Sequence, residues 1–133
     1  MNYNYLLDTH VLIWWLEGSS KIGRRAKKAL LHPEARVWVS AAAIWEISIK
    51  AALGRLDPFD PPEGWTLTLV DELGVRSLPI TFEHAAAVRH LPLHHADPFD
   101  RVLIAQARCE SLTLVTVDPS MDAYDVRTLD ASE

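Results

Sequence analysis

The chain has 133 residues, of which 49% are hydrophobic and 23% charged, and its net charge is −5. This length and composition predict one globular domain over residues 1–133 with a buried core. The single cysteine, Cys109, excludes an internal disulfide framework and fits a reducing cytoplasm. An acidic surface does not attract nucleic acid as a whole, so a polyanionic substrate would need a local basic patch or a bound cation.

The apolar N-terminal stretch could be mistaken for a signal peptide. It lacks a basic leading region, and Asp8 interrupts an apolar run that is far shorter than a membrane span. We therefore predict that it belongs to the core and that the protein does not associate with a membrane.

Strands and helices are predicted to alternate in the first part of the chain. They are a strand over 3–8, a short helix from 9 to about 18, a helix over 20–32, a strand over 36–40 and a helix over 41–53. Ser20 and Ser40 are predicted N-caps, while Pro33 and Gly54 are the predicted stops.

The second part of the chain continues this alternation. Its predicted segments are a turn-rich connection over 57–64, a helix over 65–73, an extended segment over 75–80, a helix over 81–91, a helix beginning at Pro98, a strand over 112–117 and a strand over 126–129. Thr81 and Asp97 are the predicted N-caps, and Pro98 suits the first helical position. The pattern predicts an α/β protein, a three-layer α/β/α sandwich around a mostly parallel sheet.

Four acidic residues stand near the ends of predicted strands or the starts of predicted helices. Asp8 and Asp118 follow strands, and Glu46 lies near the start of a helix among apolar neighbours. Function in parallel sheets gathers beyond the carboxyl ends of the strands, so these three should share one rim. The helix of Asp100 leads into the strand over 112–117, and a simple crossover would start it at the opposite edge. We therefore expect a long loop over 81–96, or a slanted helix, to bring Asp100 back.

Each acid also has a purely structural interpretation. Asp8 and Asp118 could cap turns, Asp100 could favour the positive helix N-terminus, and Glu46 could pair with Lys50 on a solvated face. Carboxylates brought together repel one another, however, and a hard divalent cation relieves that repulsion. Oxygen ligands without a thiolate suit Mg²⁺ or Mn²⁺, which activate water and stabilise a leaving oxygen. These residues therefore favour phosphodiester hydrolysis.

Four segments resemble, in this order, the motif regions of PIN-domain proteins, and most closely the VapC-type toxins of type II toxin–antitoxin pairs. They are YLLDTHVLIWWL, SAAAIWEISIKAALGRL, LPLHHADPFDRVLIAQA and LTLVTVD. The resemblance runs from Tyr5 to about Tyr124 and implies a Mg²⁺- or Mn²⁺-dependent endoribonuclease that leaves a 5′-phosphate and a 3′-hydroxyl. It also implies an RNA substrate, a small antitoxin protein that blocks the acidic pocket, a homodimer and a cytoplasmic location.

The resemblance assigns the four acids of the family to Asp8, Glu46, Asp100 and Asp118. Asp8 and Asp100 would be direct metal ligands. Glu46 would orient or deprotonate the attacking water, and Asp118 would bind a second ion or act through water. Thr116 matches the small hydroxyl residue often found beside this site.

Three further residues are candidates for supporting roles around the acids. Thr9 is a candidate to support the metal ligands or contact substrate. Asp97 is expected to cap its helix rather than to bind metal. Arg101 could contact a phosphate or form a salt bridge.

Other charged groups leave alternatives open. Five basic residues on the helix predicted over 20–32 form either a solvated face or a surface for RNA or antitoxin; they are Lys21, Arg24, Arg25, Lys27 and Lys28. Four histidines could suggest zinc, but no cysteine partner or zinc-type spacing supports it; they are His84, His90, His94 and His95. His10 is ambiguous.

Two other functions compete with nuclease activity. A phosphotransfer domain would need a second aspartate two residues after Asp8, where His10 stands, or a lysine after the last strand, where none follows. A catalytically degenerate PIN domain would serve only as an RNA- or protein-binding module. The presence of all four acids argues against such decay.

Overall fold

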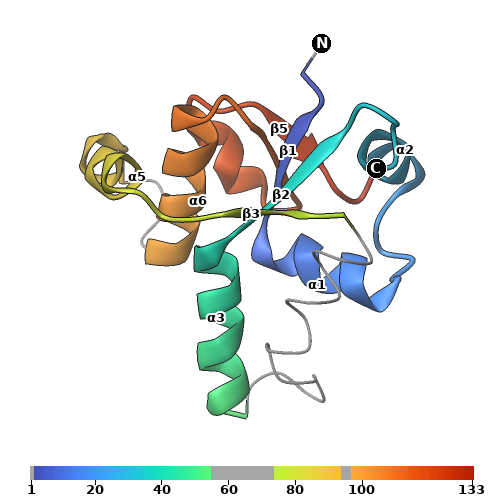
Figure 1. Cartoon of the computed structure of the whole chain (residues 1–133), viewed down its shortest axis with the longest axis horizontal. Coiled ribbons are helices and arrows are strands. Elements are labelled where there is room, and N and C mark those ends of the chain that lie inside the picture. Colours follow the sequence, from blue (N-terminus) through green and yellow to red (C-terminus); the bar gives the residue numbers. More distant parts are fainter. Residues whose placement is uncertain (1, 55–73, 94–96) are drawn as a thin grey trace.

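The computed structural model describes residues 2–54, 74–93 and 97–133. Within these ranges a single sheet has the strand order β3-β2-β1-β4-β5, and all neighbouring strands are parallel (Figure 1). The strands are β1 (Asn4–Leu7), β2 (Arg36–Ser40), β3 (Arg76–Leu78), β4 (Thr113–Thr116) and β5 (Thr128–Asp130). The predicted parallel sheet is confirmed.

Helices cover both faces of this sheet, as the three-layer prediction requires. Their bounds are α1 (Thr9–Glu17), α2 (Arg24–Leu30), α3 (Ala41–Ala52), α5 (Phe82–Ala87) and α6 (Pro98–Cys109), with 3₁₀ turns η2 (Val88–His90) and η3 (Pro119–Ala123). Figure 1 shows α2 on one side of the strands and α5 with α6 on the other. No helix within the described ranges is long and apolar enough to cross a membrane.

Neighbouring residues of the central strands point into opposite halves of the core. Leu6 and Leu114 belong to the cluster beneath α6, whereas Leu7 and Val115 belong to the cluster beneath α1, and all four are fully buried. This follows from the period of two along a strand. Because both faces are covered, these strands are almost continuously apolar.

Most of the predicted helix ends are confirmed. The Ser40 hydroxyl accepts the Ala42 N–H at 3.0 Å, and Thr81 accepts the His84 N–H at 3.2 Å. The predicted helix over 81–91 is divided into α5 and the short turn η2. Gly54, just beyond α3, has a φ of +69°, a conformation that favours glycine at a helix end.

The predicted start of α2 is wrong. The helix begins after Gly23, not after Ser20, because the Gly23 backbone lies against the C-terminal segment. Its N–H donates to the Ala131 carbonyl at 2.8 Å, and a Cβ at this position would lie 2.3 Å from the Glu133 carbonyl carbon. As a consequence, Lys21 lies in the turn before α2 rather than on the helix with the other basic residues.

Two boundaries also shift, and two predictions lie outside the described residues. The last strand is β5 at 128–130 rather than 126–129, and the extended segment over 75–80 narrows to β3. The turn-rich connection over 57–64 and the helix over 65–73 fall in the range that the structure does not describe.

We expect Gly23→Ala to lower the free energy of unfolding by about 1–3 kcal/mol, the usual cost of forcing an extra carbon into a packed site. Denaturant unfolding would measure it. The matched control is the same substitution in a chain that ends at Ala131, where the contacting atoms are gone and the cost should largely vanish. An equal cost in both chains would contradict the proposed contact.

Candidate active site

The carboxyl ends of β1 and β4 meet where the strand order of the sheet reverses. The chain moves from β1 outward to β2 and β3, then returns to add β4 on the other side of β1. Connections leave in opposite directions at such a point, which opens a crevice above the two strands. Asp8 follows β1, and Asp118 lies two residues beyond β4.

A cavity of about 310 Å³ occupies this crevice. Its lining residues are Asp8, Thr9, His10, Trp14, Glu46, Lys50, Asp97, Asp100, Val117 and Asp118. The four predicted acids therefore surround one pocket, although they come from four separate parts of the chain.

Asp100 reaches this pocket more simply than the sequence suggested. The expectation that a plain crossover would start its helix at the opposite edge is wrong. A helix that runs against the strands and ends where β4 begins must itself start at the carboxyl edge. Asp100, in the first turn of α6, therefore faces the same rim without a slanted helix.

Asp8 is held between two neighbouring hydroxyl-bearing residues. Its Oδ1 accepts the Thr9 N–H at 2.7 Å, and its Oδ2 accepts the Thr116 hydroxyl at 2.7 Å. The pairing of Leu7 with Val115 brings the next residues of β1 and β4, Asp8 and Thr116, side by side. Asp8 is only 5% exposed, so these bonds satisfy a carboxylate that is almost removed from water.

Burial raises the pKa of Asp8 above its ordinary value of 3.8. The hydrogen bonds from Thr116 and Thr9 and a charge on His10 lower this pKa, and the neighbouring charge of Glu46 raises it further. Desolvation outweighs the hydrogen bonds, since an ionised carboxylate loses most of its hydration in such a site.

Glu46 is buried beside Asp8 rather than on a solvated face. It is 7% exposed, and its Oε1 accepts the Thr9 hydroxyl at 2.7 Å while its Oε2 lies 3.0 Å from the Lys50 ammonium. Thr9 thus donates to both carboxylates, through its backbone to Asp8 and through its side chain to Glu46. The predicted pairing of Glu46 with Lys50 is present, but within the pocket wall.

Asp97 and Asp118 each cap the turn that follows them. The Asp97 Oδ1 accepts the N–H groups of Phe99 at 2.8 Å and Asp100 at 3.2 Å, so its predicted role as the N-cap of α6 is confirmed. The Asp118 Oδ1 accepts both the N–H and the hydroxyl of Ser120, at 3.0 and 2.7 Å. Both caps still line the cavity.

The carboxylates surround the pocket without converging on a single point. Among the described residues, no three acidic, histidine or cysteine side chains lie close enough together to hold a metal ion as a group. Mg²⁺ commonly keeps several waters and uses only one or two protein carboxylates plus substrate phosphate oxygens. A pocket that has five carboxylates and no cysteine in its lining, with its acids spread in this way, fits such a loosely held, hydrated ion rather than a closed protein cage.

Arg101 does not line the cavity. It is 9% exposed, and its guanidinium donates to the backbone carbonyls of Pro92 at 2.9 Å and of Val88 and Leu91 at 3.1 Å. These contacts let Arg101 support the chain before α6, and its two predicted roles, a phosphate contact or a salt bridge, stay predictions.

The histidines divide between the core, the surface and the undescribed part. His84 is fully buried, with Nε2 2.9 Å from a Glu110 carboxylate oxygen and Nδ1 accepting the Thr81 N–H at 3.1 Å. His90 is exposed, and His94 and His95 lie outside the described residues. His10 is the histidine that lines the acidic pocket.

Four lining residues were not among the predicted site residues: His10, Trp14, Lys50 and Val117. A helical spacing could have indicated the first three. His10 and Trp14 are four residues apart on α1, and Lys50 is four residues after Glu46 on α3, so each pair shares one helix face.

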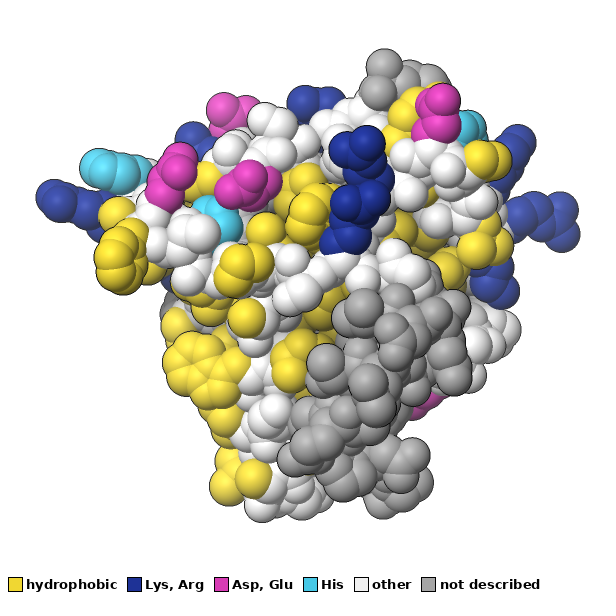
Figure 2. Space-filling view, in the orientation of Figure 1, with side chains coloured by type: hydrophobic (Ala, Val, Ile, Leu, Met, Phe, Trp, Pro, Cys, Tyr) yellow, Lys and Arg dark blue, Asp and Glu magenta, His cyan; other side chains and the backbone are white. Residues whose placement is uncertain are grey.

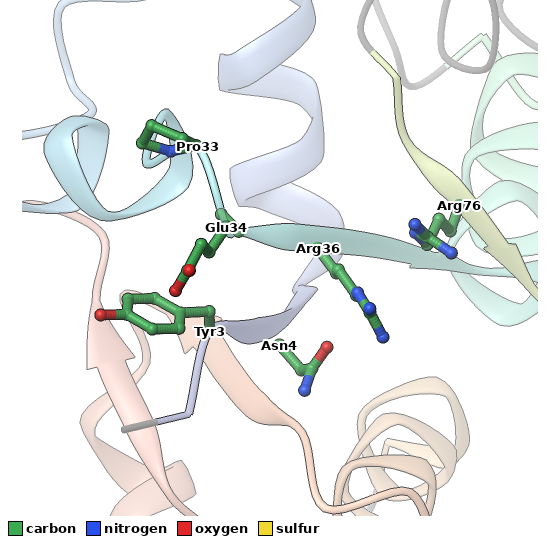
Figure 3. Close-up of a pocket in the computed structure, with 7 residues that line it drawn as sticks. Tyr3, Asn4, Pro33, Glu34, Arg36 and Arg76 are labelled. Carbon is green, nitrogen blue, oxygen red and sulfur yellow. The ribbon is translucent and has the colours of Figure 1, made fainter.

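A larger cavity lies at the opposite edge of the sheet. It measures about 470 Å³, and its lining residues are Tyr3, Asn4, Pro33, Glu34, Ala35, Arg36 and Arg76 (Figure 3). It surrounds the first residues of β1, β2 and β3 and contains one carboxylate beside two guanidinium groups. We place the candidate site in the smaller cavity because its buried, paired carboxylates can support chemistry.

The chain is similar to proteins of known type over most of its length. The PIN domain family model matches residues 5–127. The ribonuclease VapC22 of Mycobacterium tuberculosis is 32% identical over 120 residues, which cover 90% of either chain.

Solved structures share the fold. VapBC2 from Rickettsia felis, bound to a promoter DNA fragment, matches with a TM-score of 0.71 at 11% identity, covering 95% of this chain and 97% of that chain. FitAcB from Neisseria gonorrhoeae matches with a TM-score of 0.65 at 25% identity, covering 96% and 97%. At 11% identity, the Rickettsia match is a likeness of fold alone.

Asp8→Asn should make the metal-free protein more stable at neutral pH. Because the folded-state pKa of Asp8 is raised above the unfolded one, its ionised form opposes folding. This penalty is fully present above the raised pKa and fades as pH falls toward 3.8. In chelator, we expect a Tm gain of roughly 2–6 °C at pH 7, the shift that about 1 kcal/mol produces in a domain of this size, and a smaller gain near pH 4.

Asp130→Asn is the matched control for this experiment. Hydrogen bonds from the Ser132 hydroxyl and N–H lower the pKa of Asp130, so its charge supports the fold and the support is lost as pH falls. This variant should gain no stability at pH 7. A Tm for Asp8→Asn equal to or below that of the wild type at pH 7 would contradict the assigned cost of the buried charge.

Proposed function

Because the chain belongs to the PIN-domain family, and within it to the VapC-type proteins, we propose that it is a divalent-metal-dependent endoribonuclease, the toxin of a toxin–antitoxin pair. The observation that carries this proposal is the gathering of Asp8, Glu46, Asp100 and Asp118 around one cavity at the switch point of the sheet. The family match over residues 5–127 supports one domain across residues 1–133.

Asp8 and Asp100 would hold the Mg²⁺ or Mn²⁺ ion. When bound, such an ion supplies the positive charge that a chain of net charge −5 lacks, contacts a phosphodiester oxygen and lowers the pKa of an attacking water. The abundance of carboxylates in the pocket and their spread around it support a hard, partly hydrated cation.

The residues around these ligands keep the carboxylates in place. Thr9 and Thr116 each donate to one oxygen of Asp8, which leaves further lone pairs of this carboxylate for another partner. Glu46, fixed by Thr9 and Lys50, is positioned at the cavity wall to accept a proton from water or to orient it. Asp118, which also lines the cavity, would bind a second ion or act through water.

Asp100→Asn should abolish most of the RNA cleavage without loss of the fold. The substitution keeps the shape of the side chain but removes a charged ligand, so the rate on an unstructured RNA oligonucleotide should fall by roughly 100-fold or more, within the range for a positioned catalytic group. Chelator should stop the wild type, and added Mg²⁺ or Mn²⁺ should restore it. Asp125→Asn, at an exposed position before β5 on the opposite edge of the sheet, is the control that should retain full activity. Equal cleavage by Asp100→Asn and the wild type would refute the catalytic assignment.

The degenerate alternative makes a different prediction about metal. Calorimetric titration with Mg²⁺ should show binding by the wild type that is weakened in Asp8→Asn and in Asp100→Asn. An absence of binding, or binding that is unchanged in both variants, would favour a module that only binds RNA or protein.

We also propose a small antitoxin protein as the physiological partner and the cytoplasm as the location. Several structural neighbours are complexes of this kind, among them a toxin–antitoxin complex from Klebsiella pneumoniae, which matches with a TM-score of 0.63 at 18% identity. That likeness concerns the fold, so co-purification with the product of a neighbouring short gene would be the test of this partner.

A homodimer is the other proposed assembly, and α3 offers a surface for it. Trp45, Ile49 and Leu53 are four residues apart and are 58%, 39% and 59% exposed. Figure 2 shows hydrophobic side chains gathered over the part of the molecule where Figure 1 places α3. Contacts between identical subunits are more apolar than the average surface, which supports a second copy on this face.

We expect Ile49→Lys combined with Leu53→Lys to convert a dimer into a monomer, because two buried charges would oppose the contact. Analytical ultracentrifugation would measure the mass in solution. Phe82→Lys, at an equally apolar but 96% exposed position on α5, is the control that should leave the mass unchanged. A dimer that survives the double substitution would contradict the assignment of this face.

A further inference from the structure

We propose that Trp14 is a stacking platform for an unpaired base beside the scissile phosphate, and that Lys21 contacts the adjoining phosphate. This inference rests on the ribonuclease function proposed above and specifies the form of the substrate. Trp14 lies on α1, which starts directly after Asp8, and its side chain lines the same cavity as the acids.

The position of Trp14 is not explained by the packing of the core. Its neighbour Trp15 packs against the cluster beneath α1, and Trp38 packs against the cluster beneath α6. Within the described residues, Trp14 is not among the hydrophobic side chains packed against either cluster. Among the described residues, this half-buried indole lines the acidic pocket instead of joining either core cluster.

The Trp14 ring already carries a small cationic group. The Lys21 ammonium lies 5.6 Å from the ring centroid, within the range of a cation–π interaction. Lys21 is exposed and lies in the turn before α2, so its long side chain can move. A base could replace the ammonium on this ring while the lysine turned to a phosphate.

The charge of the pocket explains why a base rather than a phosphate should lie at this wall. Five of the ten lining residues are acidic, and Lys50 is the one lysine or arginine among them. Such a wall repels every phosphate that a cation does not neutralise. A neutral base stacked on Trp14 would attach the nucleotide next to the cut without adding another phosphate to the acidic rim.

Stacking of this kind limits the substrate to unpaired nucleotides. A base inside a duplex is covered on both faces by its neighbours, so it cannot also cover an indole. Every base has a π-face, so the contact tolerates sequence. The contact with Trp14 should therefore require an unpaired nucleotide and discriminate little among the four bases.

The test compares steady-state cleavage of an unpaired RNA oligonucleotide, in Mg²⁺, by the wild type and by Trp14→Leu, Trp14→Phe and Phe82→Leu. Loss of one stacked base is expected to raise KM by roughly 5- to 100-fold in Trp14→Leu, with a smaller change in kcat. Trp14→Phe keeps an aromatic face and should lie between it and the wild type. Phe82→Leu makes a comparable change on α5, away from the cavity, and should leave KM unchanged.

A second substrate separates stacking from a structural role. The same oligonucleotide with abasic nucleotides flanking the cleavage position should be a poor substrate for the wild type, with KM raised by a similar factor. Trp14→Leu should respond little to the missing base, because its partner is already gone. Lys21→Gln should reduce the slope of log KM against log salt by about 1, as the loss of one phosphate contact does.

The outcomes separate this inference from the proposed function. A wild type that cleaves no RNA would refute the ribonuclease proposal and the stacking role with it. A wild type that cleaves, beside a Trp14→Leu variant of unchanged KM, would overturn the stacking role alone. Additive effects of Trp14→Leu and the abasic substrate would overturn it as well, as would a Trp14→Leu variant that keeps its KM but escapes inhibition by an antitoxin.

Discussion

The arrangement of this molecule depends on a carboxylate buried at the end of the central strand. Asp8 is 5% exposed, and its charge is tolerated because Thr9 and Thr116 donate hydrogen bonds to its two oxygens. The second bond requires the parallel register of β1 and β4, since only that pairing brings Thr116 beside Asp8. The hydrogen bonds between β1 and β4 therefore also fix the position of Asp8 in the pocket.

From Asp8 the polar contacts continue across the rim. Thr9 connects Asp8 to Glu46, and Glu46 is paired with Lys50, so strand β1 and helix α3 share a continuous set of interactions. This network lies at the rim where the proposed RNA substrate would approach a protein of net charge −5. The concentration of negative charge is unfavourable for the fold alone, and a cation that binds there would relieve it. Stability and activity thus make opposite demands on the same carboxylates.

The sequence predicted which acidic residues line the pocket better than it predicted how they are brought together. The acids were found from strand ends and from a family resemblance, and Asp97 was correctly assigned as the cap of α6. The route by which Asp100 reaches the rim was wrong, because the direction of α6 relative to the strands was misjudged. For Arg101 the sequence left open a phosphate contact or a salt bridge, and it did not indicate that this side chain is buried against the backbone before α6. Neither the position of Asp100 at the rim nor the burial of Arg101 could be predicted from neighbouring residues, since each depends on how distant segments of the chain pack together.

Local patterns along the chain were enough to predict the alternation of strands and helices, the parallel class of the sheet and the caps at Ser40, Thr81 and Asp97, because periodicity and capping act over a few residues. The start of α2 after Gly23 rather than Ser20 follows instead from packing, since Gly23 contacts the end of the chain more than a hundred residues away. The same long-range contact leaves Lys21 outside the helix. Local sequence patterns do not predict such long-range contacts, because these depend on the packing of the whole chain.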